Sequence, residues 1–130
     1  MSTYVTNCLC SLLCDHVMSN QELFIRKAAS LALRSPLRQH RHGCVIVRNG
    51  EIVSEGFNHN FVHMYHLHSV HAEVDALSKL PRDKKFMSQC DMYVVRIGPD
   101  SLGNPLKLSK PCCSCTQAIL KAGLRRVYYS

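Results

Sequence analysis

The sequence of 130 residues contains no tryptophan, no internal repeat, no low-complexity tract and no linker rich in proline or glycine. None of its apolar runs approaches the roughly 20 residues that a membrane-spanning helix needs. Residues 1–17 lack the basic segment of a signal peptide and include Asp15 and His16. These absences exclude a repeat protein, a membrane-spanning helix and a chain of two domains. We therefore expect one soluble, cytoplasmic globular unit.

Acidic residues are scarce, whereas cysteine and histidine are abundant. Nine Asp and Glu stand against sixteen Lys and Arg, which gives a formal net charge of +7, and the chain has eight Cys and eight His. Without a secretory signal, this many cysteines indicate reduced thiols and metal ligands rather than a disulfide framework. The basic charge favours phosphate-bearing molecules, and it fits nucleotides and nucleic acids equally well.

Hydrophobic periodicity and turn residues predict the element order α-β-β-α-β-α-β. The amphipathic helix over 22–33 ends near Ser35-Pro36, and Asn49-Gly50 is a strong hairpin signal between two strands. An antiparallel hairpin followed by strand–helix–strand alternation predicts an α/β fold, with helices on both faces of a mixed sheet. The expected elements are helices 22–33, 72–80 and 113–121, strands 44–47, 52–57, 92–97 and 127–129, and loops 59–69 and 98–110.

Two short motifs carry the chemistry, and each opens a predicted helix. In His71-Ala72-Glu73, a histidine and a carboxylate are two residues apart; in Pro111-Cys112-Cys113-Ser114-Cys115, two cysteines are three apart. Residues three apart lie on one helical face, so both thiols can reach a single ion. Three ligands of this type are typical of a catalytic zinc, which keeps a fourth position for water. The carboxylate of Glu73 is then suited to move protons to and from that water.

The same motifs form the H-x-E…P-C-x-x-C signature, and the chain resembles the cytidine/deoxycytidylate deaminase superfamily of zinc enzymes from about Glu22 to Ser130. The resemblance implies a cytidine-deaminase-like three-layer α/β/α fold. It also implies hydrolytic deamination of a cytosine nucleoside or nucleotide (cytidine, deoxycytidine or dCMP), with release of ammonia. The landmarks are Gly43-Cys44-Val45-Ile46-Val47, Glu55-Gly56-Phe57-Asn58, His71-Ala72-Glu73-Val74-Asp75-Ala76-Leu77, Pro111-Cys112-Cys113-Ser114-Cys115 and Arg126-Val127-Tyr128-Tyr129.

The resemblance further implies a role for individual residues. One catalytic Zn²⁺ per chain is expected to bind His71, Cys112 and Cys115, and Glu73 is expected to be the catalytic proton shuttle. The backbone N–H of Ala72 is expected to bind the pyrimidine O2. Asn58 is expected to bind the sugar, although an Asn here also fits a turn that ends a strand.

The N-terminal region leaves two interpretations open. Residues 1–20 are expected to form a Cys-rich extension packed on a deaminase domain of residues 21–130. Its C-x-C-x3-C-x-H pattern is either a second, structural zinc site or a set of small apolar thiols within a helix. The residues of that pattern are Cys8, Cys10, Cys14 and His16.

Two other functions compete with nucleotide deamination. The +7 charge also fits an enzyme that edits nucleic acid, either transfer-RNA adenosine or polynucleotide cytosine, but the sequence marks no aromatic platform for stacking bases. A catalytically silent zinc- or nucleotide-binding module is the other alternative.

The loop over 59–69 also leaves two interpretations open. Either its histidines bind phosphate together with Arg38 and Arg41, or the loop is simply solvated. The histidines are His59, His63, His66 and His68.

The last strand is expected to leave an exposed sheet edge that a homo-oligomer would cover.

Overall fold

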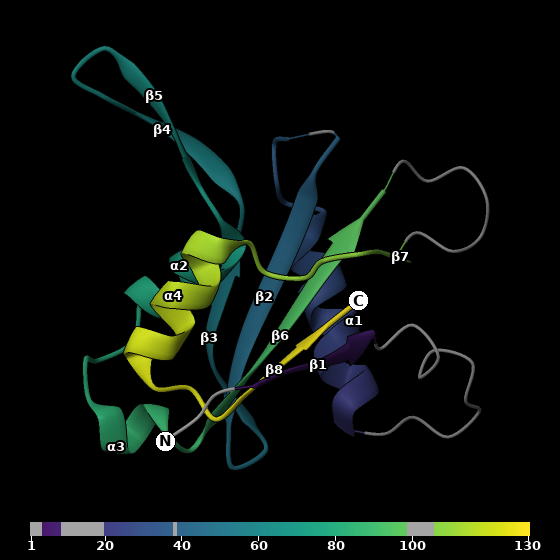
Figure 1. Ribbon diagram of the computed structural model, residues 1–130. Helices are drawn as coiled ribbons and strands as arrows, with labels where there is room; N and C mark the ends of the chain where they lie inside the picture. The colour runs from purple at the N-terminus through teal and green to yellow at the C-terminus, as the bar shows by residue number, and fades with distance from the viewer. Residues whose placement is uncertain (1–3, 9–19, 38, 99–105) are drawn as a thin grey trace.

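The computed structural model describes residues 4–8, 20–37, 39–98 and 106–130 (Figure 1). Within these ranges the chain forms twelve short elements, and a mixed sheet lies at their centre. In chain order they are β1 (Tyr4–Cys8), α1 (Asn20–Ala32), β2 (Arg41–Arg48), β3 (Glu51–Phe57), β4 (His59–His63), β5 (His66–Val70), α2 (Ala72–Ser78), α3 (Lys84–Met87), β6 (Cys90–Ile97), β7 (Leu106–Lys107), α4 (Cys113–Ala122) and β8 (Arg126–Tyr129).

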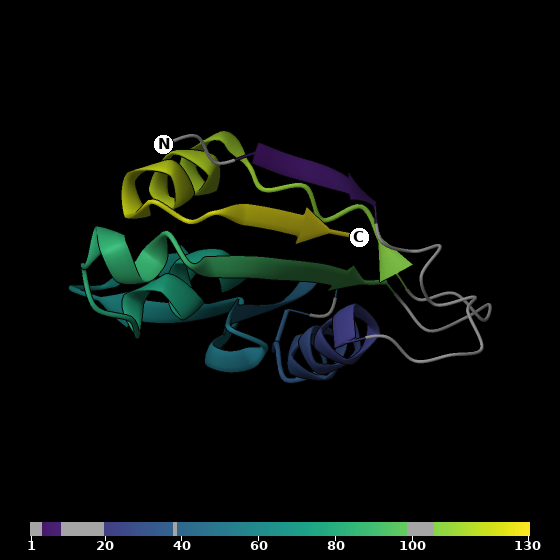
Figure 2. The ribbon, with the colours of Figure 1, turned by 90° about the horizontal axis from the view of Figure 1, so that it is seen from below.

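The main sheet has the strand order β1-β8-β6-β2-β3, and β7 pairs with the end of β6. Strand β2 is antiparallel to β3 and β6, whereas β8 is parallel to both β6 and β1. Figure 2 shows β1, β8 and β6 side by side with their arrowheads toward the same side. The sheet is therefore mixed, as the sequence predicts, and the parallel pair β6 and β8 flanks helix α4.

Helices cover the two faces of the sheet, and each face has its own core. Because successive strand residues point to opposite faces, Val45 and Val47 of β2 pack with α1, whereas Cys44 and Ile46 pack with α2 and α4. Figure 1 shows α2 and α4 together on one side of the sheet and α1 on the other. The three-layer α/β/α arrangement is confirmed.

The predicted helices and turns match the structure closely. Helices 22–33, 72–80 and 113–121 correspond to α1, α2 and α4. The β2–β3 turn has φ +52° at Asn49 and +79° at Gly50, the left-handed pair that a two-residue hairpin requires. Gly123 ends α4 with φ +87°, in the left-handed position that favours glycine after a helix.

Three expectations were wrong or incomplete. Residues 59–69, expected to be a loop, form most of the β4–β5 hairpin, which projects from the body in Figure 1. Strand β8 is not an edge, because β1 pairs with it in parallel. The expected loop 98–110 includes the short strand β7, which pairs with the end of β6. After α2 the chain forms the short helix α3, where the backbone N–H groups of Lys85 and Phe86 donate to the Asp83 carboxylate. None of the helices in the described ranges is long and apolar enough to span a membrane.

Candidate active site

Helices α2 and α4 begin next to each other, and the two chemical motifs lie at these two helix starts. His71 is the residue before α2, with an extended backbone (φ −76°, ψ 153°). Cys112 holds the equivalent place before α4, where its sulfur accepts a hydrogen bond from the backbone N–H of Cys115 at 3.4 Å. The positive ends of both helices therefore point to one place.

His71, Cys112 and Cys115 form the site that the sequence predicts could hold a metal. Their ligand atoms all lie within 4.8 Å of one another. His71 Nδ1 is 3.2 Å from the Cys115 sulfur and 3.7 Å from the Cys112 sulfur. The Cys115 side chain is buried, whereas His71 and Cys112 are exposed, so the cluster is open to solvent on one side.

Glu73 lies on the buried side of this cluster, where it is only 4% exposed. Burial raises the pKa of the Cys115 thiol far above its ordinary value. The negative charge of Glu73, and a hydrogen bond between Glu73 and the thiol, raise that pKa further. A cation between the sulfurs offsets both effects, because a coordinating thiol loses its proton. The donor set of one imidazole and two thiols, with a carboxylate beside it, therefore fits a Zn²⁺ ion that keeps an open position.

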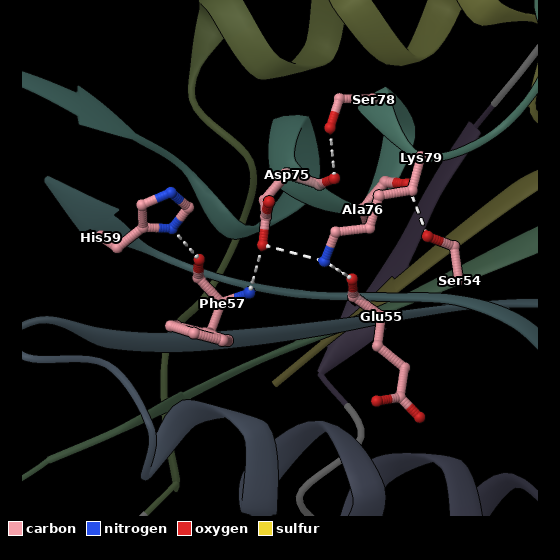
Figure 3. Close-up of polar contacts among 8 residues, drawn as sticks. All are labelled: Ser54, Glu55, Phe57, His59, Asp75, Ala76, Ser78 and Lys79. Atoms are coloured by element: carbon pink, nitrogen blue, oxygen red, sulfur yellow. Dashed lines mark hydrogen bonds and ion pairs between the residues drawn. The ribbon is translucent and has the colours of Figure 1, made fainter. Parts of the chain in front are cut away.

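The strand β3 fixes the position of α2 through a very close approach at Gly56. A Cβ added there would lie 2.5 Å from the Ala72 carbonyl oxygen and 2.6 Å from the Ala76 nitrogen. Only glycine lets the strand and the helix come this close. The Ser54 hydroxyl donates to the Ala76 carbonyl at 2.6 Å, which adds a hydrogen bond across the same contact (Figure 3).

Two charged side chains, one in α2 and one on the residue that follows it, bind the backbone of β3, as Figure 3 shows. The Asp75 carboxylate accepts the Phe57 N–H at 3.1 Å, and the Lys79 ammonium donates to the Glu55 carbonyl at 2.7 Å. Lys79 and Asp75 also form an ion pair at 3.5 Å. These contacts fix the orientation of the helix that carries Glu73 and follows His71.

Asn58 follows β3 and is 6% exposed. Its amide oxygen accepts the His42 N–H at 2.8 Å, and its amide nitrogen donates to the His40 carbonyl. These two bonds hold the end of β3 against the start of β2 and the residues just before it.

His42, at the start of β2, has a pKa below its ordinary value, mainly because it is buried. The charges of Arg96 and His71 also lower this pKa. The His40 carbonyl and the Glu73 carboxylate raise it, but by less than burial lowers it.

A cavity of about 350 Å³ opens beside the cluster, and the β4–β5 hairpin forms one wall of it. Phe61 and His68 line it together with His71, Val74 and Cys115. The sequence interpretation missed Phe61 as a site residue. The available signal was an aromatic residue ten positions before His71, which has little value until the strand pairing is known.

The remaining predicted site residues are only partly described. Ala72 is the first residue of α2 and fully buried, and N–H groups in the first turn have no partner within the helix. Cys113 is exposed and lies outside the cluster. Cys8 ends β1, whereas Cys10, Cys14, His16 and Arg38 lie outside the described residues, so the second zinc site stays a prediction.

Comparison with known proteins gives a family and several related folds. Residues 18–130 match the family described as the cytidine and deoxycytidylate deaminase zinc-binding region. A search of curated protein sequences gives no match. The crystal structure of dCMP deaminase from the cyanophage S-TIM5 in apo form has a TM-score of 0.64 and 22% identity, covering 86% of this chain and 84% of that chain. The same enzyme in complex with dCMP and dUMP also has a TM-score of 0.64, with 21% identity, covering 88% of this chain and 83% of that chain.

Two further similar structures are those of enzymes whose names give different substrates. Guanine deaminase from Bacillus subtilis has a TM-score of 0.57 and 26% identity, covering 86% of this chain and 64% of that chain. Cytidine deaminase from Burkholderia pseudomallei has a TM-score of 0.53 and 19% identity, covering 82% of this chain and 78% of that chain. Fold and cluster together are those of a zinc-binding deaminase domain. The chain belongs to the cytidine and deoxycytidylate deaminase family.

Proposed function

We propose that the protein is a zinc-dependent hydrolytic deaminase that converts the cytosine of a nucleoside or nucleotide to uracil and releases ammonia. The observation that carries this proposal is the cluster of His71, Cys112 and Cys115, with ligand atoms within 4.8 Å, and the buried Glu73 beside it. Membership of the family supports the reaction class. The complex of the cyanophage dCMP deaminase with dCMP and dUMP supports a pyrimidine nucleotide as substrate.

His71, Cys112 and Cys115 are the residues that would hold the zinc. When bound, Zn²⁺ supplies the Lewis acidity that lowers the pKa of water toward about 7. The two cysteines would bind as thiolates, because a thiol loses its proton when it coordinates a metal ion. The burial of Cys115 and the exposure of Cys112 leave the open side of the cluster toward the solvent.

Glu73 would move the protons of the reaction. Its carboxylate takes a proton from the attacking water as the C4–O bond forms, and it delivers that proton to the ring nitrogen N3. It then transfers the remaining water proton to the amino group as the C4–N bond breaks, so that ammonia leaves and a C4 carbonyl remains. A buried carboxylate suits this role, because the exclusion of water around it limits the leakage of its proton to bulk solvent.

Two further contacts would position the substrate. The backbone N–H of Ala72, in the first turn of α2, would donate to the pyrimidine O2. Asn58 would contact the sugar with the amide hydrogen and the lone pair that its bonds to His40 and His42 leave unused. We also expect a homo-oligomer, which sedimentation analysis of the purified protein would detect.

The test is ammonia release by zinc-quantified protein from cytidine, deoxycytidine, CMP and dCMP, with adenosine and guanine as alternative substrates. Glu73→Gln keeps the shape of the side chain but cannot act as a base, and we expect it to lose about 10²–10⁴-fold in kcat. Glu51→Gln, at the exposed start of β3, is the matched control and keeps full activity. Turnover by Glu73→Gln at the wild-type rate, or no turnover of any compound by zinc-loaded protein, would refute the proposal.

A further inference from the structure

A groove of about 550 Å³ lies between α2, α3 and α4, and it is larger than the cavity beside the cluster. Its walls are mainly apolar: Val74 and Leu77 come from α2, Met87 from α3 and Ala118 from α4. Figure 1 shows these three helices grouped at one side of the sheet. A groove of this volume with apolar walls is typical of a binding surface.

The polar rim of the groove is basic. Arg82, Lys84 and Lys121 line it, and none of the described residues that line it is an Asp or a Glu. The ion pairs within the described ranges are formed by other cations. Asp83, between two of the rim residues in the chain, accepts hydrogen bonds from the first backbone N–H groups of α3. The groove therefore combines an apolar floor with three positive charges that have no acidic neighbour on its walls.

Val74 belongs both to this groove and to the candidate active site. It lines the groove and also the cavity that His71 and Cys115 line, and it is 39% exposed. It also directly follows the buried Glu73 in α2. A molecule that filled the groove would therefore cover Val74 and lie next to the cavity.

We propose that the groove binds an acidic, amphipathic helix of another protein. A groove beside packed helices can accept the apolar side chains that a further helix presents at positions i, i+3, i+4 and i+7. Acidic residues that flank those positions would face Arg82, Lys84 and Lys121, which gives the contact its charge complementarity. A second copy of the chain fits this groove less well, because a two-fold contact would bring the two basic rims together. The homo-oligomer proposed above would therefore use another face.

The probe is a synthetic peptide of about 18 residues, which is long enough to form a helix. It carries leucine at positions i, i+3, i+4 and i+7, and glutamate and glutamine elsewhere. One control peptide has the same composition with its leucines scattered around the helix, and another has lysine in place of each glutamate. Fluorescence anisotropy with zinc-loaded protein should give a micromolar Kd for the probe. Each control peptide should bind at least about tenfold more weakly, since loss of one buried leucine or of the charge complementarity is worth that much.

Two groove variants test the surface itself. Ala118→Glu adds an acidic side chain to the wall of the groove, and the double variant Lys84→Glu with Lys121→Glu reverses two rim charges. Each should weaken binding of the probe by at least about tenfold, because like charges then face each other. The matched control combines Arg26→Glu with Lys107→Glu, which makes the same change of net charge on exposed residues of α1 and β7 (Figure 1). At physiological salt, where such distant charges are screened, this control should keep the Kd. Thermal unfolding checks that each variant is folded.

The outcomes that would overturn the proposal are distinct from one another. They are no binding of the probe, equal binding of the peptide with scattered leucines, and an unchanged Kd in either groove variant. Sedimentation analysis tests the second copy: a wild-type oligomer that Ala118→Glu converts to a monomer would show that the groove is a contact between chains, and this too would overturn the proposal. Peptide binding is measured without turnover, so none of these outcomes depends on the deaminase function.

Discussion

Substitution of Gly56 by alanine is expected to perturb the candidate active site without changing any residue in it. The new Cβ would lie 2.5 Å from the Ala72 carbonyl oxygen, and contacts below 3.0 Å are essentially never found, so β3 and α2 must separate by about 0.5 Å. Overpacking of this kind costs about 1–3 kcal/mol in the free energy of unfolding. For a chain of this length, that is a fall in Tm of roughly 3–15 °C.

The displaced helix carries Glu73, and functional groups need positions held to within about 0.5 Å. Since a 1 Å misplacement costs about 10²-fold, we expect kcat to fall by about tenfold in Gly56→Ala at a temperature where the protein is folded. Gly50→Ala is the control: its φ of +79° makes alanine unfavourable by about 1–2 kcal/mol, but nothing lies within 4 Å of the new Cβ.

Gly50 lies in the β2–β3 turn, at the other end of the sheet from the cluster (Figure 1). The assay pairs urea unfolding with steady-state ammonia release for the wild type and both variants. Gly50→Ala should lose stability and keep kcat, whereas Gly56→Ala should lose both. If Gly56→Ala keeps the wild-type kcat and stability, the close approach between β3 and α2 does not position the site.

Three further predictions concern α2, acid stability and the metal. Asp75→Ala removes the acceptor of the Phe57 N–H, so the free energy of unfolding in urea should fall by about 1.5–3 kcal/mol. The variant should lower kcat more than it changes KM. Asp75→Asn should restore part of the stability and part of kcat. Because burial lowers the pKa of His42 below its ordinary value, the unfolded chain binds the proton more readily, and stability is lost as the pH falls below about 6.5. His42→Gln should therefore lose less stability than the wild type between pH 7.5 and 5.5, and parallel losses would contradict this. Removal of zinc with a chelator should abolish ammonia release and lower Tm, and added Zn²⁺ should restore both.

Local signals in the sequence predict the centre of this fold. The Asn49-Gly50 pair fixes the β2–β3 hairpin, and Gly123 fixes the end of α4, because both positions need a left-handed backbone. The spacing of Cys112 and Cys115 at a helix start predicts that both thiols face one place, and His71 lies beside them. Short-range chemistry of this kind can be read directly from the order of residues.

Features that depend on tertiary context could not be predicted in this way. The β4–β5 turn has φ +49° at Met64 and +68° at Tyr65, where the sequence has none of the glycine or asparagine that usually marks such a turn. Strand β1 gains its place only by pairing with β8, more than one hundred residues away in the chain. The bonds of Asn58 to the backbone of His40 and His42 likewise depend on the pairing of β2 with β3.

The most direct test of the central claim is zinc K-edge X-ray absorption of the purified protein. The account predicts, at each catalytic zinc, two sulfur ligands at about 2.3 Å together with nitrogen or oxygen ligands at about 2.0–2.1 Å. Cys112→Ser and Cys115→Ser should each lose one sulfur ligand or the metal itself, whereas Cys113→Ser, exposed and outside the cluster, should leave the spectrum unchanged. A zinc spectrum that Cys112→Ser and Cys115→Ser both leave unaltered would contradict the account.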